Sequence, residues 1–237
     1  MRKTGFGIVV GWVLLLFCLP TRAQVGEHRT DLAIGVNAGY TMNQVTFEPG
    51  IKQSWKGAPA LGFTVRYTCE KYFKSLCAVQ MEVNYANLGW KEVIETSSDT
   101  YERDVHYIQV PFLARMGWGY ERKGAMFYCV AGPQLGFCIG DNDRRSGAFD
   151  EMTLSLRPNR VYQQYDMPVE NKFDYGITAG LGVELNSRIG HFMLEGRYYY
   201  ALGDMYGNGK KDVFGRSANG TIVAKFTYLI DVVRTKK

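Results

Sequence analysis

The sequence predicts an all-β protein: an eight-stranded antiparallel up-and-down β-barrel that crosses a membrane, preceded by a cleaved signal peptide. Three observations predict it. Apolar and polar residues alternate in eight segments, these segments are long for strands, and short connections between them alternate with long ones. Strict alternation indicates a strand with one apolar and one polar face. A tilted strand of about 9–11 residues is long enough to cross a bilayer.

The clearest alternation lies in residues 173–186, FDYGITAGLGVELN, where the odd positions are apolar. After the turn SRIG, residues 191–202 alternate again, which predicts a hairpin. Glycine weakens a strand that faces solvent, but it leaves room for long side chains inside a narrow barrel. The polar face, with Gly180 and Glu184, is therefore assigned to the lumen, and the apolar face, with Ile177 and Leu181, to lipid. A soluble, lipocalin-like barrel would reverse this assignment and is kept as an alternative.

At the start of the chain, residues 1–23 read as a secretory signal peptide. Arg2 and Lys3 precede an apolar run, and a small residue, Ala23, precedes the expected cleavage point. The apolar run is too short for a membrane anchor. Cleavage leaves residues 24–237 as one barrel domain and, by removing Arg2, Lys3 and Arg22, lowers the net charge from +5 to +2. No polybasic tract remains, so nucleic acid is not an expected partner.

The other six strands are predicted at residues 31–40, 58–68, 77–88, 105–117, 125–140 and 220–231. An even number of strands is typical of single-chain outer-membrane barrels, and closure removes the strand edges that lipid does not tolerate. Residues 69–76, 118–124 and 187–190 are short connections, whereas 41–57, 89–104, 141–172 and 203–219 are long. This asymmetry predicts the cell outer membrane as the location, with periplasmic termini and extracellular long loops.

Aromatic residues near the strand ends are expected to form interfacial girdles. These residues are Tyr40, Tyr67, Trp90, Trp118, Tyr120, Phe173 and Tyr198.

Five segments also resemble a known family: IGVNAGY, HYIQVPFLARMGW, YCVAGPQLGF, DYGITAGLGVEL and LEGRYYYALGD. With these segments in this order, the chain resembles the PorT-like outer-membrane β-barrel proteins of Gram-negative bacteria across essentially the whole mature sequence. The resemblance implies an eight-stranded barrel with a periplasmic N-terminus. It implies no single activity, although some members of the family are linked to protein secretion across the outer membrane.

Charged residues are predicted on the inward face of several strands. Because an unpaired buried charge is costly and eight strands leave room only for side chains, we expect these charges to pair as a plug. A gated ion path or a proton relay is the alternative. The interior charge network is predicted to contain Arg66, Glu82, Arg115, Glu184, Glu195, Arg197 and Lys225.

Other candidate sites are less specific. His106 and His191 show no serine and acid at matching depth, so both are interpreted as interface residues. Cys69 and Cys77 flank a short turn and form either a disulfide or two free thiols. The longest loop is either a recognition site or a solvated, variable segment. Its candidate recognition residues are Arg144, Arg145, Arg157, Arg160, Tyr162 and Tyr165.

Three function classes follow from the sequence. The first is a non-enzymatic barrel, monomeric in outer-membrane lipid, with a structural or interaction role and with envelope or secretion-system proteins as partners. The second is a small porin or channel. The third is a lipid-modifying membrane enzyme. No metal motif is present in the sequence, and no cofactor is expected.

Overall fold

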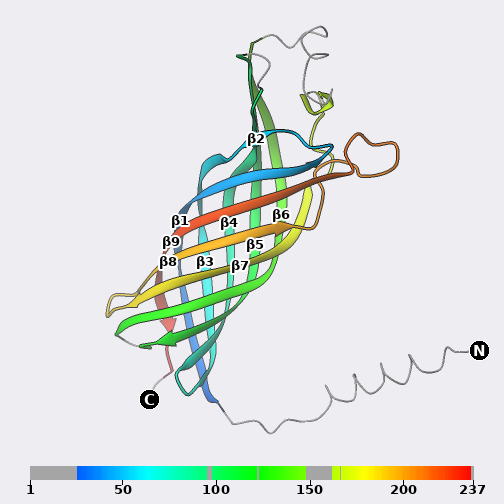
Figure 1. Cartoon of the computed structure of the whole chain (residues 1–237). Helices are drawn as coiled ribbons and strands as arrows, with labels where there is room; N and C mark the ends of the chain where they lie inside the picture. The colour runs from blue at the N-terminus through cyan, green and yellow to red at the C-terminus, as the bar shows by residue number, and fades with distance from the viewer. Residues whose placement is uncertain (1–25, 95–97, 122, 148–161, 166, 236–237) are drawn as a thin grey trace, which may run out of the picture.

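The computed structural model describes residues 26–94, 98–121, 123–147, 162–165 and 167–235. Its strands form one antiparallel sheet that closes on itself through the pairing of β4 with β5 (Figure 1). Eight strands form the ring, and the two-residue strand β2 is attached to β4. The strands are β1 (Glu27–Glu48), β2 (Gln53–Ser54), β3 (Lys56–Tyr72), β4 (Ser75–Glu92), β5 (Thr100–Gly119), β6 (Gly124–Ser146), β7 (Phe173–Asn186), β8 (His191–Ala201) and β9 (Arg216–Val233).

The predicted all-β barrel of eight antiparallel strands is thus confirmed, with longer strands than the alternation indicates. Strand β7 matches its predicted segment residue for residue. In contrast, β1, β5 and β6 continue into segments that the sequence assigns to loops. In the β1 extension the alternation reverses, since the apolar residues Val45 and Phe47 lie on the inner face and the outer residues are polar.

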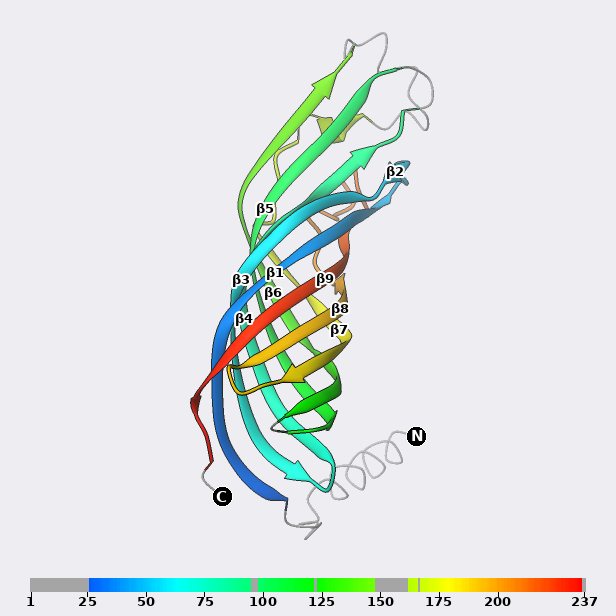
Figure 2. The same ribbon diagram turned by 90° about the vertical axis from the view of Figure 1, so that its left-hand side faces the viewer.

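The two ends of the barrel differ in their connections (Figures 1 and 2). At one end, short connections join β3 to β4, β5 to β6 and β7 to β8, and β1 begins and β9 ends there. We call this the turn end. The opposite end carries the long connections and is called the loop end.

The outer surface is apolar over the middle of the barrel. Ile177 and Leu181 are 54% and 57% exposed, whereas Glu184 on the opposite face of β7 is 1% exposed. An apolar band of this extent is not stable in water, but it fits contact with lipid. Of the predicted girdle aromatics, Tyr40, Tyr67, Trp118, Tyr120, Phe173 and Tyr198 are exposed. Trp90 is fully buried, so its assignment to the girdle is wrong.

The signal peptide predicted at residues 1–23 lies outside the described residues. Among the residues that are described, no helix is both long and apolar enough to span a membrane.

Candidate functional site: the charged lumen

The predicted interior charges come together in two groups inside the barrel. The central group joins β4, β8 and β9. Arg197 donates two hydrogen bonds to Glu82, at 2.7 and 3.0 Å, and the Lys225 ammonium lies 2.6 Å from both Glu82 oxygens. Glu195 contacts Arg197 and lies 3.7 Å from Lys225 as an ion pair, without the geometry of a hydrogen bond. All four side chains are buried. Because β4 lies across the ring from β8, the group joins opposite walls of the barrel.

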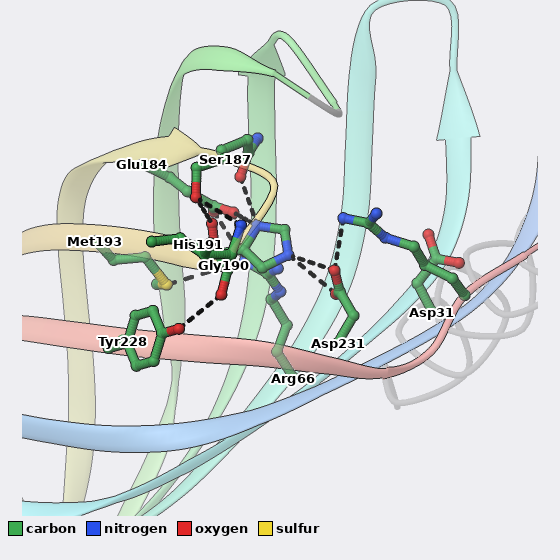
Figure 3. Close-up of polar contacts among 12 residues, drawn as sticks. Asp31, Arg66, Glu184, Ser187, Gly190, His191, Met193, Tyr228 and Asp231 are labelled. Carbon is green, nitrogen blue, oxygen red and sulfur yellow. Dashed lines mark hydrogen bonds and ion pairs between the residues drawn. The ribbon is translucent and has the colours of Figure 1, made fainter.

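The second group lies nearer the turn end (Figure 3). The Arg66 guanidinium on β3 donates to both Glu184 oxygens on β7 at 2.8 Å, again across the lumen. Arg115 on β5 contacts the same carboxylate. His191 lies beside it, with Nδ1 2.8 Å from a Glu184 oxygen and Nε2 2.9 Å from Asp231 on β9. Nδ1 also lies 2.5 Å from Asn186 Oδ1, so both imidazole nitrogens have acceptor oxygens beside them.

The β7–β8 turn positions His191. Ser187 donates through its hydroxyl to the Gly190 carbonyl at 2.7 Å, and its backbone N–H donates to the same oxygen. Gly190 has a φ of +142°, which glycine adopts at little cost. Tyr228 on β9 donates to the Ile189 carbonyl at 2.6 Å and holds the turn against the neighbouring strand. His191 follows Gly190 directly, and the fixed turn starts β8 with the His191 ring toward the lumen.

Sequence reasoning misses two members of this group. The interpretation of His191 as an interface residue is wrong, because it is buried between Glu184 and Asp231. The alternation contains the signal for both. His191 has the parity of Glu195 on β8, and Asp231 has the parity of Lys225 on β9. Adding Asp231 to the seven predicted charges gives four acidic and four basic side chains.

Glycines on the inner face of β7 make room for large neighbours. A Cβ at Gly180 would lie 2.7 Å from Arg197 Cγ, and one at Gly182 would overlap Tyr128 Cζ. The Tyr128 ring cannot retreat easily because the Arg115 guanidinium lies over it, 3.9 Å from the ring centroid. These close approaches agree with the role that the sequence assigns to the inward glycines.

Replacing Gly182 by alanine is expected to lower the free energy of unfolding by about 1–3 kcal/mol, because the new methyl group overlaps the Tyr128 ring. Gly196→Ala on the adjacent strand is the matched control, since a Cβ there has no neighbour within 4 Å. Denaturant unfolding of both variants in phospholipid vesicles provides the measurement. Equal midpoints for the two variants would contradict the proposed packing.

The loop end of the lumen is filled differently, by a cluster of buried aromatic side chains that we call the aromatic cap. Phe47 and Trp90 lie in edge contact at 5.1 Å between centroids, and Tyr101 and Tyr165 at 4.7 Å. The cap contains side chains from strand extensions and from the long connections, and all are at most 5% exposed. Its members are Phe47, Trp90, Tyr101, Tyr165, Tyr206 and Phe214.

The cap changes the interpretation of the longest loop. The prediction of Tyr165 as a recognition residue is wrong: it is 1% exposed and donates to Glu92 at 3.0 Å. Arg144 and Arg145 lie in β6 rather than in a loop, and Arg145 donates to the Tyr165 carbonyl. Tyr162 is exposed. Arg157 and Arg160 lie outside the described residues.

Beside the cap, Asp104 on β5 contacts charged side chains from β3 and β6. Lys56 Nζ lies 2.6 Å from its carboxylate, and Arg144 lies at 2.8 Å. Burial acts to raise the pKa of Asp104, but Lys56 and Asn87 outweigh it and hold that pKa below its usual range. Burial is also the main reason that the pKa of Lys56 is lowered, against the attraction of Asp104. The ion pair fastens the loop end, and the lowered pKa of Asp104 favours its charged form.

The cysteines do not form the disulfide considered from the sequence. Cys69 and Cys77 are both free thiols. The pairing of β3 with β4 shifts register between Thr68 and Glu70, so that Glu70 lies opposite Cys77. Cys69 occupies the irregularity and has no position opposite Cys77 from which a disulfide could form.

Little empty space accompanies the turn-end charges. The cavity that Arg66, Glu184, His191 and Asp231 help to line has a volume of about 40 Å³, enough for only a few water molecules. In the described part of the chain, no group of histidine, cysteine or acidic residues is arranged to hold a metal ion. The arrangement can brace the barrel walls and exclude bulk water.

A closed antiparallel ring with a lipid-facing apolar surface and a charged interior defines the class of outer-membrane β-barrels. Residues 22–207 match the family model described as outer membrane protein beta-barrel domain, and the chain belongs to that family.

Among solved structures, the chain is similar to the outer membrane protein OprG from Pseudomonas aeruginosa, at 11% identity over 87% of this chain and 95% of that chain, with a TM-score of 0.43. It is also similar to the attachment invasion locus protein Ail of Yersinia pestis, at 13% identity over 86% and 99%, with a TM-score of 0.34. It is similar as well to Neisserial surface protein A, at 12% identity over 83% of this chain and 96% of that chain, with a TM-score of 0.39. A search of curated proteins found no match.

Proposed function

We propose that this chain is a non-enzymatic, non-conducting barrel of the outer membrane, with a structural or interaction role in the cell envelope. The observation that carries the proposal is the set of buried ion pairs across the lumen, between Arg66 and Glu184 and between Glu82 and both Arg197 and Lys225. Eight strands leave room only for side chains, and paired charges that join opposite walls hold that space closed.

The aromatic cap supports the same conclusion from the other end. A solute that entered from the loop end would have to displace packed rings before it reached the charged groups. The porin alternative requires a continuous water path through both obstacles. The enzyme alternative requires an accessible nucleophile beside a base. Ser187, in the turn before His191, instead donates its hydroxyl hydrogen to the Gly190 carbonyl.

In the proposed orientation, the turn end and both termini face the periplasm, and the loop end faces the exterior. Short periplasmic turns and longer extracellular loops are the rule in such barrels. The resemblance to PorT-like barrels adds the expectation that the partners include envelope or secretion-system proteins. In this reading a rigid, sealed barrel anchors the loop end at the cell surface.

Planar-bilayer recording tests the proposal. The wild-type chain, reconstituted in a bilayer, is expected to show no steady single-channel current, because ion pairs and rings block the path. Glu82→Gln is expected to lower stability without creating a conductance. Steady wild-type currents whose ion selectivity changes in Glu82→Gln would instead establish the porin function.

A further inference from the structure

A groove on the outer surface lies at the turn end, between the β7–β8 turn and the last residues of β9. Figure 3 shows these two segments with Gly190 in the turn and Asp231 on β9. The groove has a volume of about 230 Å³, against about 40 Å³ for the cavity inside the lumen. We call it the turn-end groove. Besides Gly190, its lining residues are Arg188, Ile189, Ile230, Asp231, Val232 and Arg234.

Close contacts fix the shape of the turn-end groove. Tyr228 on β9 donates its hydroxyl hydrogen to the Ile189 carbonyl at 2.6 Å. A Cβ at Gly190 would lie 2.5 Å from the Leu229 carbonyl oxygen and 2.9 Å from a carbon of the Tyr228 ring. The turn therefore approaches β9 more closely than a residue with a side chain would allow. Because these contacts hold the two sides in place, a ligand does not have to order them on binding.

The floor of the groove is apolar and continues the lipid-facing surface. Ile189, Ile230 and Val232 are each more than half exposed. Ile230 and Val232 lie on the same face of β9 as Ile222 and Phe226, which belong to the apolar band around the barrel. Exposure of such side chains to water is unfavourable. The floor is therefore suited to the apolar part of a lipid molecule.

Two arginines lie beside this apolar floor. Arg188 in the turn is exposed, and within the described part of the chain its guanidinium has no hydrogen bond or ion pair. The Arg234 side chain is 50% exposed, and its ion pair with Asp231 at 2.6 Å leaves several of its five N–H donors available. Asp231 is also held by His191 Nε2 at 2.9 Å. Since Arg234 balances the charge of Asp231, Arg188 gives the groove a net positive charge.

We propose that the turn-end groove binds the headgroup of an anionic phospholipid. Arg188 and Arg234 donate hydrogen bonds to the phosphodiester oxygens, because guanidinium groups match the geometry of phosphate. Ile189, Ile230 and Val232 contact the glycerol and the upper part of the acyl chains. A ligand with an anionic group next to an apolar chain satisfies both the charged and the apolar side of the groove.

Two features favour an anionic lipid over other sources of phosphate. A free phosphate ion would leave the apolar floor in water, whereas a lipid covers it. Phosphatidylcholine carries a cationic group close to its phosphate, which would lie near the two arginines and be repelled. The inference goes beyond the proposed function, because the groove lies outside the lumen. It depends neither on whether the lumen conducts nor on which side of the membrane the turn end faces.

Native mass spectrometry of the full chain tests the site. The folded barrel, purified in a non-ionic detergent, is incubated with equal amounts of phosphatidylglycerol and phosphatidylcholine. We expect the wild-type chain to retain at least about five-fold more phosphatidylglycerol, and Arg188→Gln to lose most of this preference, since hydrogen bonds to the charged phosphate are removed. Lys74→Gln is the matched control, because it removes an exposed cation from the β3–β4 turn, outside the groove.

Three outcomes of this experiment would count against the site. Equal retention of the two lipids by the wild-type chain would show that the groove does not select an anionic headgroup. An equal loss of preference in Arg188→Gln and Lys74→Gln would show that the attraction belongs to the whole turn end. Inorganic phosphate added in large excess is expected to leave phosphatidylglycerol bound. Displacement of the lipid by phosphate would assign the groove to a free anion and overturn the lipid assignment.

A second pair of variants places the lipid in the groove itself. Val232→Glu introduces a carboxylate into the groove without changing either arginine, and is expected to lower retention of phosphatidylglycerol several-fold by charge repulsion. Val233→Glu is the control, since successive residues of a strand point to opposite faces and Val233 does not line the groove. Circular dichroism checks that both variants are folded. If the folded variants retain phosphatidylglycerol equally, the lipid is not bound in the turn-end groove.

Discussion

Replacing Glu82 by glutamine is expected to lower the free energy of unfolding by about 3–5 kcal/mol. Water inside the lumen that solvates the unpaired charges reduces this loss. Glutamine keeps the size of the side chain but removes the charge that Arg197 and Lys225 share. Two buried cations would then have Glu195 as their remaining carboxylate. Urea unfolding in phospholipid vesicles, followed by tryptophan fluorescence, gives the measurement.

Two comparisons separate this effect from a general loss of charge. Glu102→Gln removes a partner of the exposed Arg144 at 3.2 Å and should cost only about 0–1 kcal/mol. Adding Lys225→Met to Glu82→Gln should recover part of the lost stability, because one unpaired cation is removed. A double variant as unstable as the sum of its single changes would show that Glu82 and Lys225 are not coupled.

The lumen was largely predictable from the sequence because its signal is local. Strand parity alone assigns Arg66, Glu184 and Arg197 to the interior, and the structure places all three there. Parity does not predict how deep along the barrel axis a side chain lies. The cross-barrel partners depend on the stagger of eight strands, so the division into two groups was not predictable.

The aromatic cap was not predictable for a different physical reason. Phe47 falls where the apolar residues of β1 change from the outer to the inner face, Tyr101 lies in a polar segment, and Tyr165 lies in a connection without any period. Trp90 resembles a girdle residue because it follows a strand with a lipid-facing side. Its burial depends on contacts with Phe47 and Tyr101, which come from elements far apart in the sequence.

Replacing Trp90 by alanine is expected to remove about 3–5 kcal/mol from the stability of the aromatic cap, through lost burial and the cavity left behind. Trp90 is fully buried and contacts Phe47, Tyr101 and Tyr206. Because the cap lies beyond the charged groups, we expect residues 167–172 and 202–215 to loosen while the barrel stays folded. Limited proteolysis and hydrogen exchange in those two segments measure the change.

Trp55→Ala is the matched control, since Trp55 is also at the loop end but is 48% exposed. Its effect should stay within about 0.5 kcal/mol, as for other surface substitutions. The two variants should therefore differ in how fast the two segments are cleaved, and agree in the unfolding midpoint of the barrel itself. If Trp90→Ala leaves both segments as protected as Trp55→Ala does, the aromatic cap is not what holds the loop end closed.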